Sequence, residues 1–217
     1  MKKNHPNNNL EKSKLLPASS VPKSGEIRIE HLSKSYGEEQ ILKNLSLTLT
    51  LGRSYCLMAP SGAGKTTLFR ILLGLEAADS GHIDGLDAIR LSAVFQEDRL
   101  LEGYTALENL RFVTGRYYTN EELTSVLLRL LPPEAMSKPV HEFSGGMKRR
   151  TAILRAILAP SDFIIMDEPF TGLDSETKQK AIDLILEFTS GKLLLFSTHH
   201  EEDANLLNAE HITLPAN

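Results

Sequence analysis

Several features are scarce or absent in this 217-residue chain: it has one cysteine, no tryptophan and no long apolar run. Cys56 has no second cysteine to pair with, so an internal disulfide is excluded and a reducing, cytoplasmic compartment is expected. No segment reaches the roughly 18 consecutive apolar residues that a membrane-spanning helix needs. The length still allows a substantial buried core, in one large or two small domains.

An excess of positive charge is also missing. The formal net charge of −4 argues against a nucleic-acid partner or bulk binding to anionic lipid, both of which require a basic surface. Residues 1–25 carry five lysines and one acid, a net of +4, so the remainder carries −8, since the whole chain carries −4. This segment has neither a sustained period nor the apolar core of a secretory signal, and we predict a disordered tail over residues 1–25.

The apolar pattern of residues 26–217 predicts one α/β domain. Ile27 and Ile29 alternate with polar residues, as do the leucines of residues 45–51, which predicts two antiparallel strands around a turn at Gly37. Short runs that are apolar throughout predict parallel strands covered on both faces. These runs are residues 55–58, 93–95, 163–166 and 193–196. Helical patterns lie between them, so we predict a doubly wound, mainly parallel sheet with an N-terminal antiparallel part.

Residues 97–143 contain helical periods and no convincing strand pattern. Leu123, Val126 and Leu127 recur at helical spacing, so we predict a helical subdomain inserted between two strands. The run from Leu68 to Leu75 has the same spacing and predicts a helix after the first parallel strand.

A glycine-rich segment separates that strand from that helix, which is the context of a phosphate-binding P-loop. Gly62 and Gly64 leave room for backbone N–H groups to turn toward phosphate oxygens, and the start of the helix adds its positive dipole. Lys65 would reach the β- and γ-phosphates, and the Thr66 hydroxyl would bind Mg²⁺. The predicted nucleotide-binding residues of this segment are Ala59, Pro60, Ser61, Gly62, Ala63, Gly64, Lys65, Thr66 and Thr67.

Ala59 stands where the P-loop pattern begins with glycine. Alanine accepts a tight turn with negative φ but not one that needs positive φ, so this mild departure concerns only the loop geometry at Ala59. A P-loop by itself indicates a superfamily that includes kinases, GTPases and motor ATPases.

Two carboxylates follow the apolar run of residues 163–166. At the carboxyl end of a strand, Asp167 is placed to hold Mg²⁺, and Glu168 is placed to act as a general base on attacking water.

Ser144, Gly145 and Gly146 precede a basic amphipathic helix, and the later strand ends in Asp-Glu-Pro. Together with the P-loop, this arrangement resembles the ATP-binding cassette (ABC) ATPases. Their signature motif is Leu-Ser-Gly-Gly-Gln, from which Phe143 and Met147 differ at the first and last positions. The serine hydroxyl, two glycine N–H groups and a helix start form a second anion site. The resemblance implies that this site binds the γ-phosphate of ATP held by a partner, either a second copy of the chain or a related cassette.

The resemblance assigns four further residues. Tyr36 matches the aromatic residue that stacks on adenine, and Gln96 matches the glutamine that joins Mg²⁺ and attacking water to the transporter interface. Asp174 matches the aspartate of the D-loop, and His199, rather than the following His200, matches the switch histidine that contacts the γ-phosphate. The implied cofactors are ATP and Mg²⁺, the implied catalytic residues are Glu168, His199 and Gln96, and the implied Mg²⁺ ligands are Thr66, Gln96 and Asp167.

The chain looks most like the separate ATPase subunit of a bacterial importer, in the group that transports nitrate, sulfonates and taurine. The resemblance implies transmembrane permease subunits, an extracytoplasmic solute-binding protein and a peripheral position on the inner face of the cell membrane. Leu100, Leu101 and Tyr104 are expected to receive a short permease helix. Gln96 lies only 31 positions after Lys65, which is fewer than this importer group leads us to expect.

Two alternatives stay open. The ATPase of a lipoprotein-release or efflux complex would share every catalytic motif. A soluble ABC ATPase acting on DNA or ribosomes is disfavoured by the net charge of −8 outside the tail and by the single cassette in the sequence.

Overall fold

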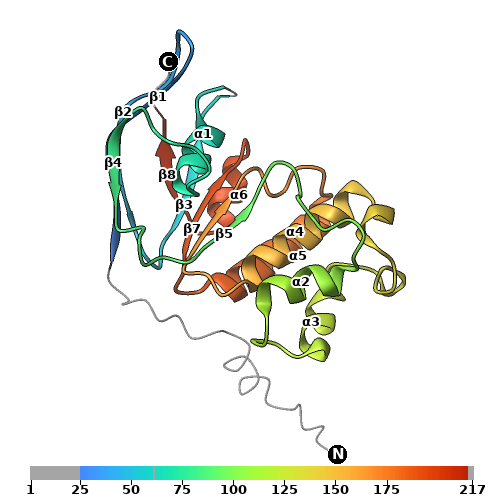
Figure 1. Cartoon of the computed structure of the whole chain (residues 1–217). Coiled ribbons are helices and arrows are strands. Elements are labelled where there is room, and N and C mark those ends of the chain that lie inside the picture. Colours follow the sequence, from blue (N-terminus) through green and yellow to red (C-terminus); the bar gives the residue numbers. More distant parts are fainter. Residues whose placement is uncertain (1–24, 61, 215–217) are drawn as a thin grey trace, which may run out of the picture.

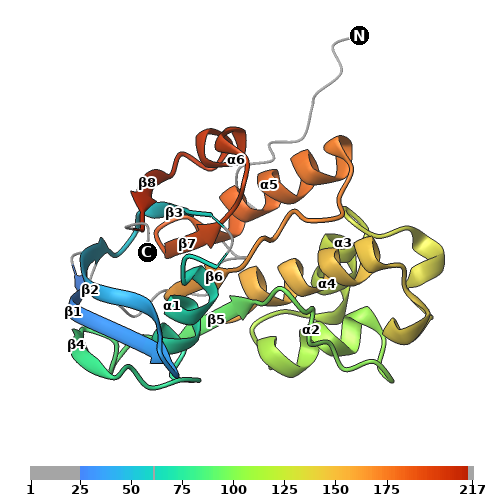
Figure 2. The ribbon, with the colours of Figure 1, turned by 90° about the horizontal axis from the view of Figure 1, so that it is seen from above.

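The computed structural model describes residues 25–60 and 62–214, so the predicted tail lies outside the described residues except for Gly25. Eight strands and six α-helices form the described part (Figure 1). A three-stranded antiparallel sheet and a five-stranded parallel sheet lie on one side, and α2, α3 and α4 form the opposite side (Figure 2). The predicted α/β class is confirmed, with the parallel and antiparallel strands in separate sheets.

The antiparallel sheet has the strand order β2-β1-β4. The predicted turn joins β1 (Glu26–Tyr36) to β2 (Glu39–Thr50), and Gly37 adopts a φ of 60° there. The third strand, β4 (Ser80–Asp84), pairs with β1 and was not predicted. Its five residues include one apolar side chain, Ile83, so the sequence lacks the alternation that reveals a strand.

The parallel sheet has the order β5-β6-β7-β3-β8. Its strands are β3 (Ser54–Met58), β5 (Leu91–Val94), β6 (Phe163–Met166), β7 (Leu193–Ser197) and β8 (Glu210–Thr213). β6 and β7 are buried along their whole length, which explains why they are apolar at every position except the last residue of β7. The carboxyl ends of β3, β6 and β7 meet at one edge, where ligands of open α/β sheets bind.

Helix α1 (Lys65–Leu72) follows β3 and packs against both sheets. It ends earlier than predicted because Gly74 adopts a φ of 67°, and the N–H of Leu75 donates to the carbonyl of Arg70 at 2.8 Å. Leu75 is therefore 50% exposed, and the prediction that it continues the buried helical face was wrong.

The described residues between 97 and 143 form α2 (Ala106–Thr114), α3 (Asn120–Leu127) and the short 3₁₀ helices η2 (Pro133–Ala135) and η3 (Val140–Glu142). Thr105 and Thr119 each begin their helix with a capping box.

The remaining helices are α4 (Gly145–Leu158), α5 (Ser175–Thr189) and α6 (Glu201–Leu206). α4 packs against α2 and α5. None of the helices within residues 25–60 and 62–214 has the length and apolar character to cross a membrane.

Candidate nucleotide site

The loop before α1 has the conformation that its glycines allow. Gly62 and Gly64 adopt φ values of 83° and 90°, and a Cβ on Gly64 would lie 2.7 Å from Cδ2 of Leu42. Ala59 is not among the described residues with positive φ, so its departure from the glycine pattern fits the loop. Ser61 lies outside the described residues.

The start of α1 leaves backbone donors and one lysine for an anion. Gly64, the N-cap, offers no side-chain cap, and no acidic residue occupies the first turn. Lys65 is only 7% exposed, and its Nζ donates to the carbonyls of Ala59 at 2.5 Å and Pro60 at 3.1 Å. A phosphate group at this place would meet a buried cation and unsatisfied N–H groups together.

A cavity of about 360 Å³ adjoins this helix start. It is lined by residues from four separate parts of the chain: Tyr36, Ile41, Gly62, Gly64, Lys65, Thr66, Thr67, Gln96 and Glu168. The fold therefore brings the predicted adenine-stacking, phosphate-binding and catalytic residues to one space.

Tyr36 lines this cavity and is 48% exposed, and its hydroxyl donates to Oε1 of Glu76. This bond raises the pKa of Tyr36 and lowers the pKa of Glu76. Glu76 also accepts from Nε of Arg70 in α1 at 3.1 Å, and Nζ of Lys34 lies 5.6 Å from the centre of the ring. The aromatic side chain is thus tied to the helix that begins the phosphate site. Glu76 was missed because the sequence does not indicate this contact.

Asp167 and Thr66 lie in direct contact at the carboxyl end of β6. The buried Asp167 accepts from Oγ1 of Thr66 at 2.7 Å and from Oγ of Ser197 at 2.6 Å. A carboxylate beside a hydroxyl supplies the oxygen ligands that Mg²⁺ prefers, so the donor set fits this ion. Gln96, the third predicted ligand, lines the adjoining cavity.

Glu168 is held in an uncommon backbone conformation with a φ of 47°. Its N–H donates to Oγ of Ser197 at 2.9 Å, and its Oε1 lies 2.9 Å from Nε2 of His199. A non-glycine residue in this region costs roughly 1 to 3 kcal/mol, and such strain concentrates at functional sites. Ser197, which contacts both Asp167 and Glu168, was not predicted because a serine at the end of an apolar strand carries no distinctive signal.

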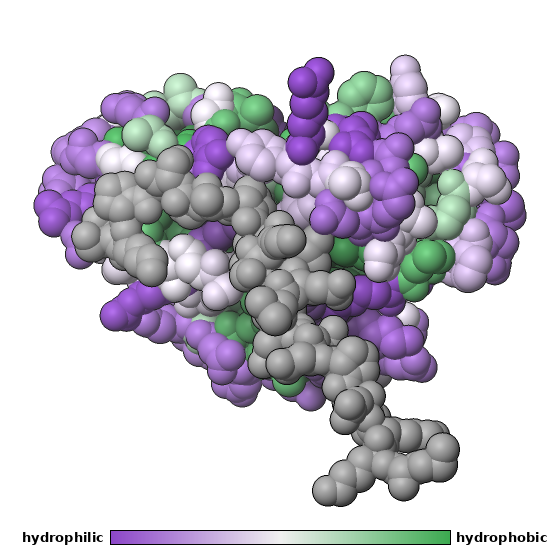
Figure 3. Space-filling view, turned by 90° about the horizontal axis from the view of Figure 1, so that it is seen from below, coloured by the Kyte–Doolittle hydropathy of each residue, from purple (hydrophilic) through white to green (hydrophobic). Residues whose placement is uncertain are grey.

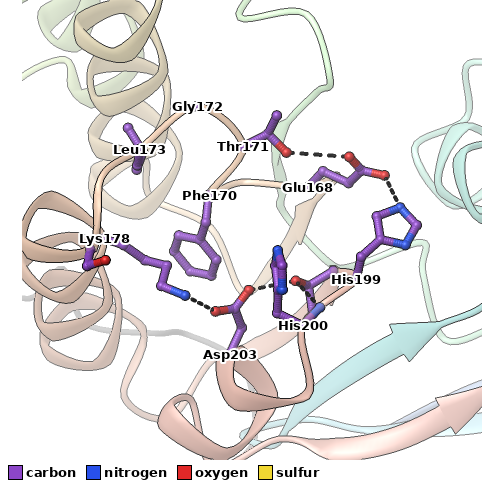
Figure 4. Close-up of a pocket in the computed structure, with 11 residues that line it drawn as sticks. Glu168, Phe170, Thr171, Gly172, Leu173, Lys178, His199, His200 and Asp203 are labelled. Carbon is purple, nitrogen blue, oxygen red and sulfur yellow. Dashed lines mark hydrogen bonds and ion pairs between the residues drawn. The ribbon is translucent and has the colours of Figure 1, made fainter.

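The two histidines after β7 have different surroundings. Figure 4 shows the His199 ring directed at Glu168, whereas the His200 ring lies on the other side of the loop, near Asp203. The buried carboxylate of Asp203 accepts from Thr198 at 2.6 Å and from Lys178 at 2.7 Å. These contacts tie the histidine-bearing loop to α5 and α6 around a second cavity of about 320 Å³.

Ser144 begins α4, where its Oγ accepts from the N–H of Met147 at 3.3 Å. Gly145 and Gly146 form the first turn, and a Cβ on Gly146 would lie 3.5 Å from the carbonyl of Gly172. None of the three predicted signature residues lines the cavity at α1, and α4 begins on the far side of the molecule from α1 (Figures 1 and 2). The signature residues therefore cannot serve the phosphate site of the same chain.

The predicted D-loop residue Asp174 caps α5. It accepts from the N–H and the Oγ1 of Thr177 at 2.9 and 2.7 Å, and these bonds lower its pKa. In the structure, its side chain acts as a helix cap.

First-turn charge separates two helices from the other four. α2, α3, α5 and α6 each have acidic residues in the first turn, whereas α1 and α4 have none. An acidic side chain at a helix start occupies the place of an anion or repels it. Within the described residues, only the α-helices α1 and α4 begin without acidic side chains.

Comparison with known families settles which of the P-loop proteins this chain resembles. The pattern described as "ABC transporter" matches residues 42–171. This chain belongs to the ABC transporter family. The family contains the cassettes whose motifs the sequence resembles, so the broader part of that expectation is confirmed.

Curated relatives of this ABC cassette include both exporters and an importer by name. It is 35% identical over 201 residues to the Nod factor export ATP-binding protein I of Paraburkholderia xenovorans, covering 83% of this chain and 65% of the relative. It is 33% identical to the spermidine/putrescine import ATP-binding protein PotA of Pasteurella multocida, covering 90% of this chain and 57% of the relative. The chain spans less than two thirds of the length of the first of these relatives. The expected nitrate, sulfonate and taurine subgroup is not confirmed.

Solved structures of ABC cassettes share the fold. A dimeric bacterial ABC transporter cassette has a TM-score of 0.75 and 28% identity, covering 87% of this chain and 94% of that one. A dimeric cassette in a post-hydrolysis state, bound to ADP and Pi, has the same TM-score and 27% identity over the same shares.

Proposed function

We propose that this ABC cassette binds ATP with Mg²⁺ and hydrolyses it to drive solute transport through separate permease subunits. One observation carries the proposal: Thr66, Asp167, Ser197, Glu168 and His199 form a continuous series of contacts beside the free start of α1. The proposed Mg²⁺ ligands Thr66 and Asp167, the proposed base Glu168 and the proposed phosphate site would thus lie together at one edge of the sheet.

The residues divide the reaction among them. Lys65 and the first N–H groups of α1 bind the β- and γ-phosphates, and Tyr36 stacks on adenine. Thr66, Asp167 and Gln96 would hold Mg²⁺, and the ion would supply positive charge that neutralises the phosphates. Glu168 removes a proton from the attacking water, and the hydrogen bond from His199 fixes the direction of the carboxylate.

A complete site requires two cassettes. Ser144, Gly145 and Gly146 lie away from their own P-loop, so they would act on ATP held by the partner chain. The dimeric state of the similar solved cassettes supports this arrangement. Asp174, the proposed D-loop residue, follows Gly172 and Leu173, which lie next to Gly146, so we place it in the same proposed interface.

Permease contact is proposed around α2. Leu101 and Tyr104 are exposed, and Leu100 is partly buried against the core. The Tyr104 ring packs edge-on against the exposed Phe112, with 5.2 Å between the ring centres. Figure 3 shows apolar groups as separate patches between polar ones on one face of the molecule. Such a contact would hold the cassette at the inner face of the membrane.

The direction of transport stays a prediction. Import, with an extracytoplasmic solute-binding protein, is the first hypothesis, and efflux or lipoprotein release is the alternative. The names of the relatives include both directions. Binding to nucleic acid is not proposed.

Replacement of the base tests the proposed reaction. Glu168→Gln keeps the size of the side chain but removes its basicity, so we expect hydrolysis to fall by roughly 100-fold or more while ATP still binds. An ATP-bound dimer should accumulate, which size-exclusion chromatography with ATP and Mg²⁺ would detect. Hydrolysis at the native rate would remove Glu168 from this role.

A further inference from the structure

Arg149 in α4 has contacts that the sequence motifs do not explain. Although arginine is usually exposed, Arg149 is only 7% exposed. Its Nη1 donates to the carbonyl of Phe95 at 2.6 Å, and its Nη2 donates to the carbonyl of Gln96 at 2.5 Å. Its Nε lies 3.2 Å from Oδ1 of Asp98. One guanidinium therefore donates hydrogen bonds to two carbonyls of the segment that follows β5 and forms an ion pair with a carboxylate of the same segment.

These contacts lie on both sides of Gln96. The carbonyl of Phe95 belongs to the peptide before the Gln96 Cα, and the carbonyl of Gln96 belongs to the peptide after it. Fixing both peptide planes fixes the direction in which the Gln96 side chain leaves the backbone. The planar fork of arginine can hold two such carbonyls at once, whereas the single ammonium of lysine has no fixed fork.

The same helix holds the rest of the segment. Arg155 donates to the carbonyls of Asp98 at 3.1 Å and Arg99 at 2.8 Å. Burial raises the pKa of the Asp98 carboxyl, and the nearby charges of Arg149, Lys148 and Arg155 oppose that rise. Removing Arg149 would leave this carboxylate without its nearest cation, so the arginine and the segment are bound to each other.

We propose that Arg149 is a positioning residue for Gln96 and that it ties the Gln96 segment to the helix whose start carries Ser144. The kinetic consequence rests on the proposed function, because it requires Gln96 to contact Mg²⁺ and water. The physical tie between α4 and the Gln96 segment does not rest on it, whereas the role of that tie in a dimer does. A movement of α4 that brings Ser144 to a partner's ATP would carry the Gln96 backbone with it, and so would link the two half-sites of one chain.

The kinetic test compares Arg149→Lys and Arg149→Gln with the matched control Lys148→Gln. Lys148 is the preceding residue of α4 and binds Glu102 at 2.9 Å, without contact to Phe95 or Gln96. We expect both Arg149 variants to lower kcat about tenfold, since small errors in position at a reacting centre have effects of this order or larger. KM for ATP should change less than about twofold, and half-maximal activity should need several-fold more Mg²⁺. The control should behave as the unmodified chain.

A second measurement does not depend on hydrolysis. In the nucleotide-free full chain, amide hydrogen exchange over residues 95–99 should become about tenfold faster in Arg149→Gln and stay unchanged in Lys148→Gln. Unchanged exchange in Arg149→Gln would overturn the proposal, and so would native kcat and Mg²⁺ dependence in both Arg149 variants. If the unmodified chain shows no ATPase activity but exchange is still faster in Arg149→Gln, the result would support the contact of Arg149 with the Gln96 segment and would overturn the proposed function instead.

Discussion

The starts of α1 and α4 are built differently although both are free of acidic residues. At α1 the backbone forms the helix start: Gly64 adopts positive φ, no side chain caps the helix, and Lys65 supplies a positive charge. At α4 a side chain caps the helix: the hydroxyl of Ser144 accepts from the N–H of Met147, and two glycines follow Ser144. A site that binds its own ligand carries its own cation. In the proposed dimer, the start of α4 would complete a site whose cation is supplied by the partner, so backbone and hydroxyl donors would be sufficient there.

Their surroundings differ in the same sense. The start of α1 lies beside the buried contacts of Thr66, Asp167 and Ser197 at the edge of the sheet. Helix α4 contacts that edge through Arg149, which binds the segment that contains Gln96. The first half-site is fixed by the core, and the second is held at a distance by a helix.

Among variants at the two helix starts, removal of the Lys65 cation should have the largest effect, and this effect is on the affinity for ATP. Lys65→Ala deletes a charge-assisted bond to phosphate, so we expect affinity for ATP to fall about 100-fold or more. Calorimetry with ATP and with tripolyphosphate would measure the loss, which should be alike for both because Lys65 contacts only the phosphates. The control Lys180→Ala removes an exposed lysine that pairs with Glu176 and should bind normally. Native ATP affinity in Lys65→Ala would contradict the assignment of α1.

An acid added to the start of α4 should separate capping from anion binding. Met147→Glu would complete a capping box with Ser144, so the free energy of unfolding should rise by about 0.5 kcal/mol or stay level. Hydrolysis should nevertheless fall about tenfold or more, because the new carboxylate repels the partner's γ-phosphate. Steady-state hydrolysis and urea unfolding would measure the two effects. Met147→Gln, which has the same shape without charge, should keep its activity, and equal rates in the two variants would argue that α4 has only a structural cap.

Stability should show the smaller difference between the two helix starts. Gly64→Ala forces a side chain into positive φ and against Leu42, at an expected cost of about 1 to 3 kcal/mol. Ser144→Ala removes one cap, at an expected cost of about 1 kcal/mol. Urea unfolding of both variants would measure the difference. A larger loss in Ser144→Ala would reverse the view that backbone geometry defines α1 and a side chain defines α4.

The glycine-rich loop, the two carboxylates after β6 and the apolar strands could be predicted because each is a local pattern with a local cause. The strand β4 could not, since it pairs along β1 with one apolar residue to mark it. Glu76, Ser197 and Asp203 were missed for a related reason: each acts through a hydrogen bond to a residue that the sequence places elsewhere.

The sequence by itself determined which side chains are candidates for binding phosphate and Mg²⁺, because residue type, glycine content and strand-helix order depend on neighbours along the chain. Only the tertiary structure decided how these groups meet. It placed His199, and not His200, against Glu168, and it separated Ser144 from Lys65 in the same chain. It also placed Arg149 where it donates to the carbonyls on both sides of the Gln96 Cα. These relations arise from the order of strands in the sheet and the packing of α4, which bring together residues that are far apart in sequence.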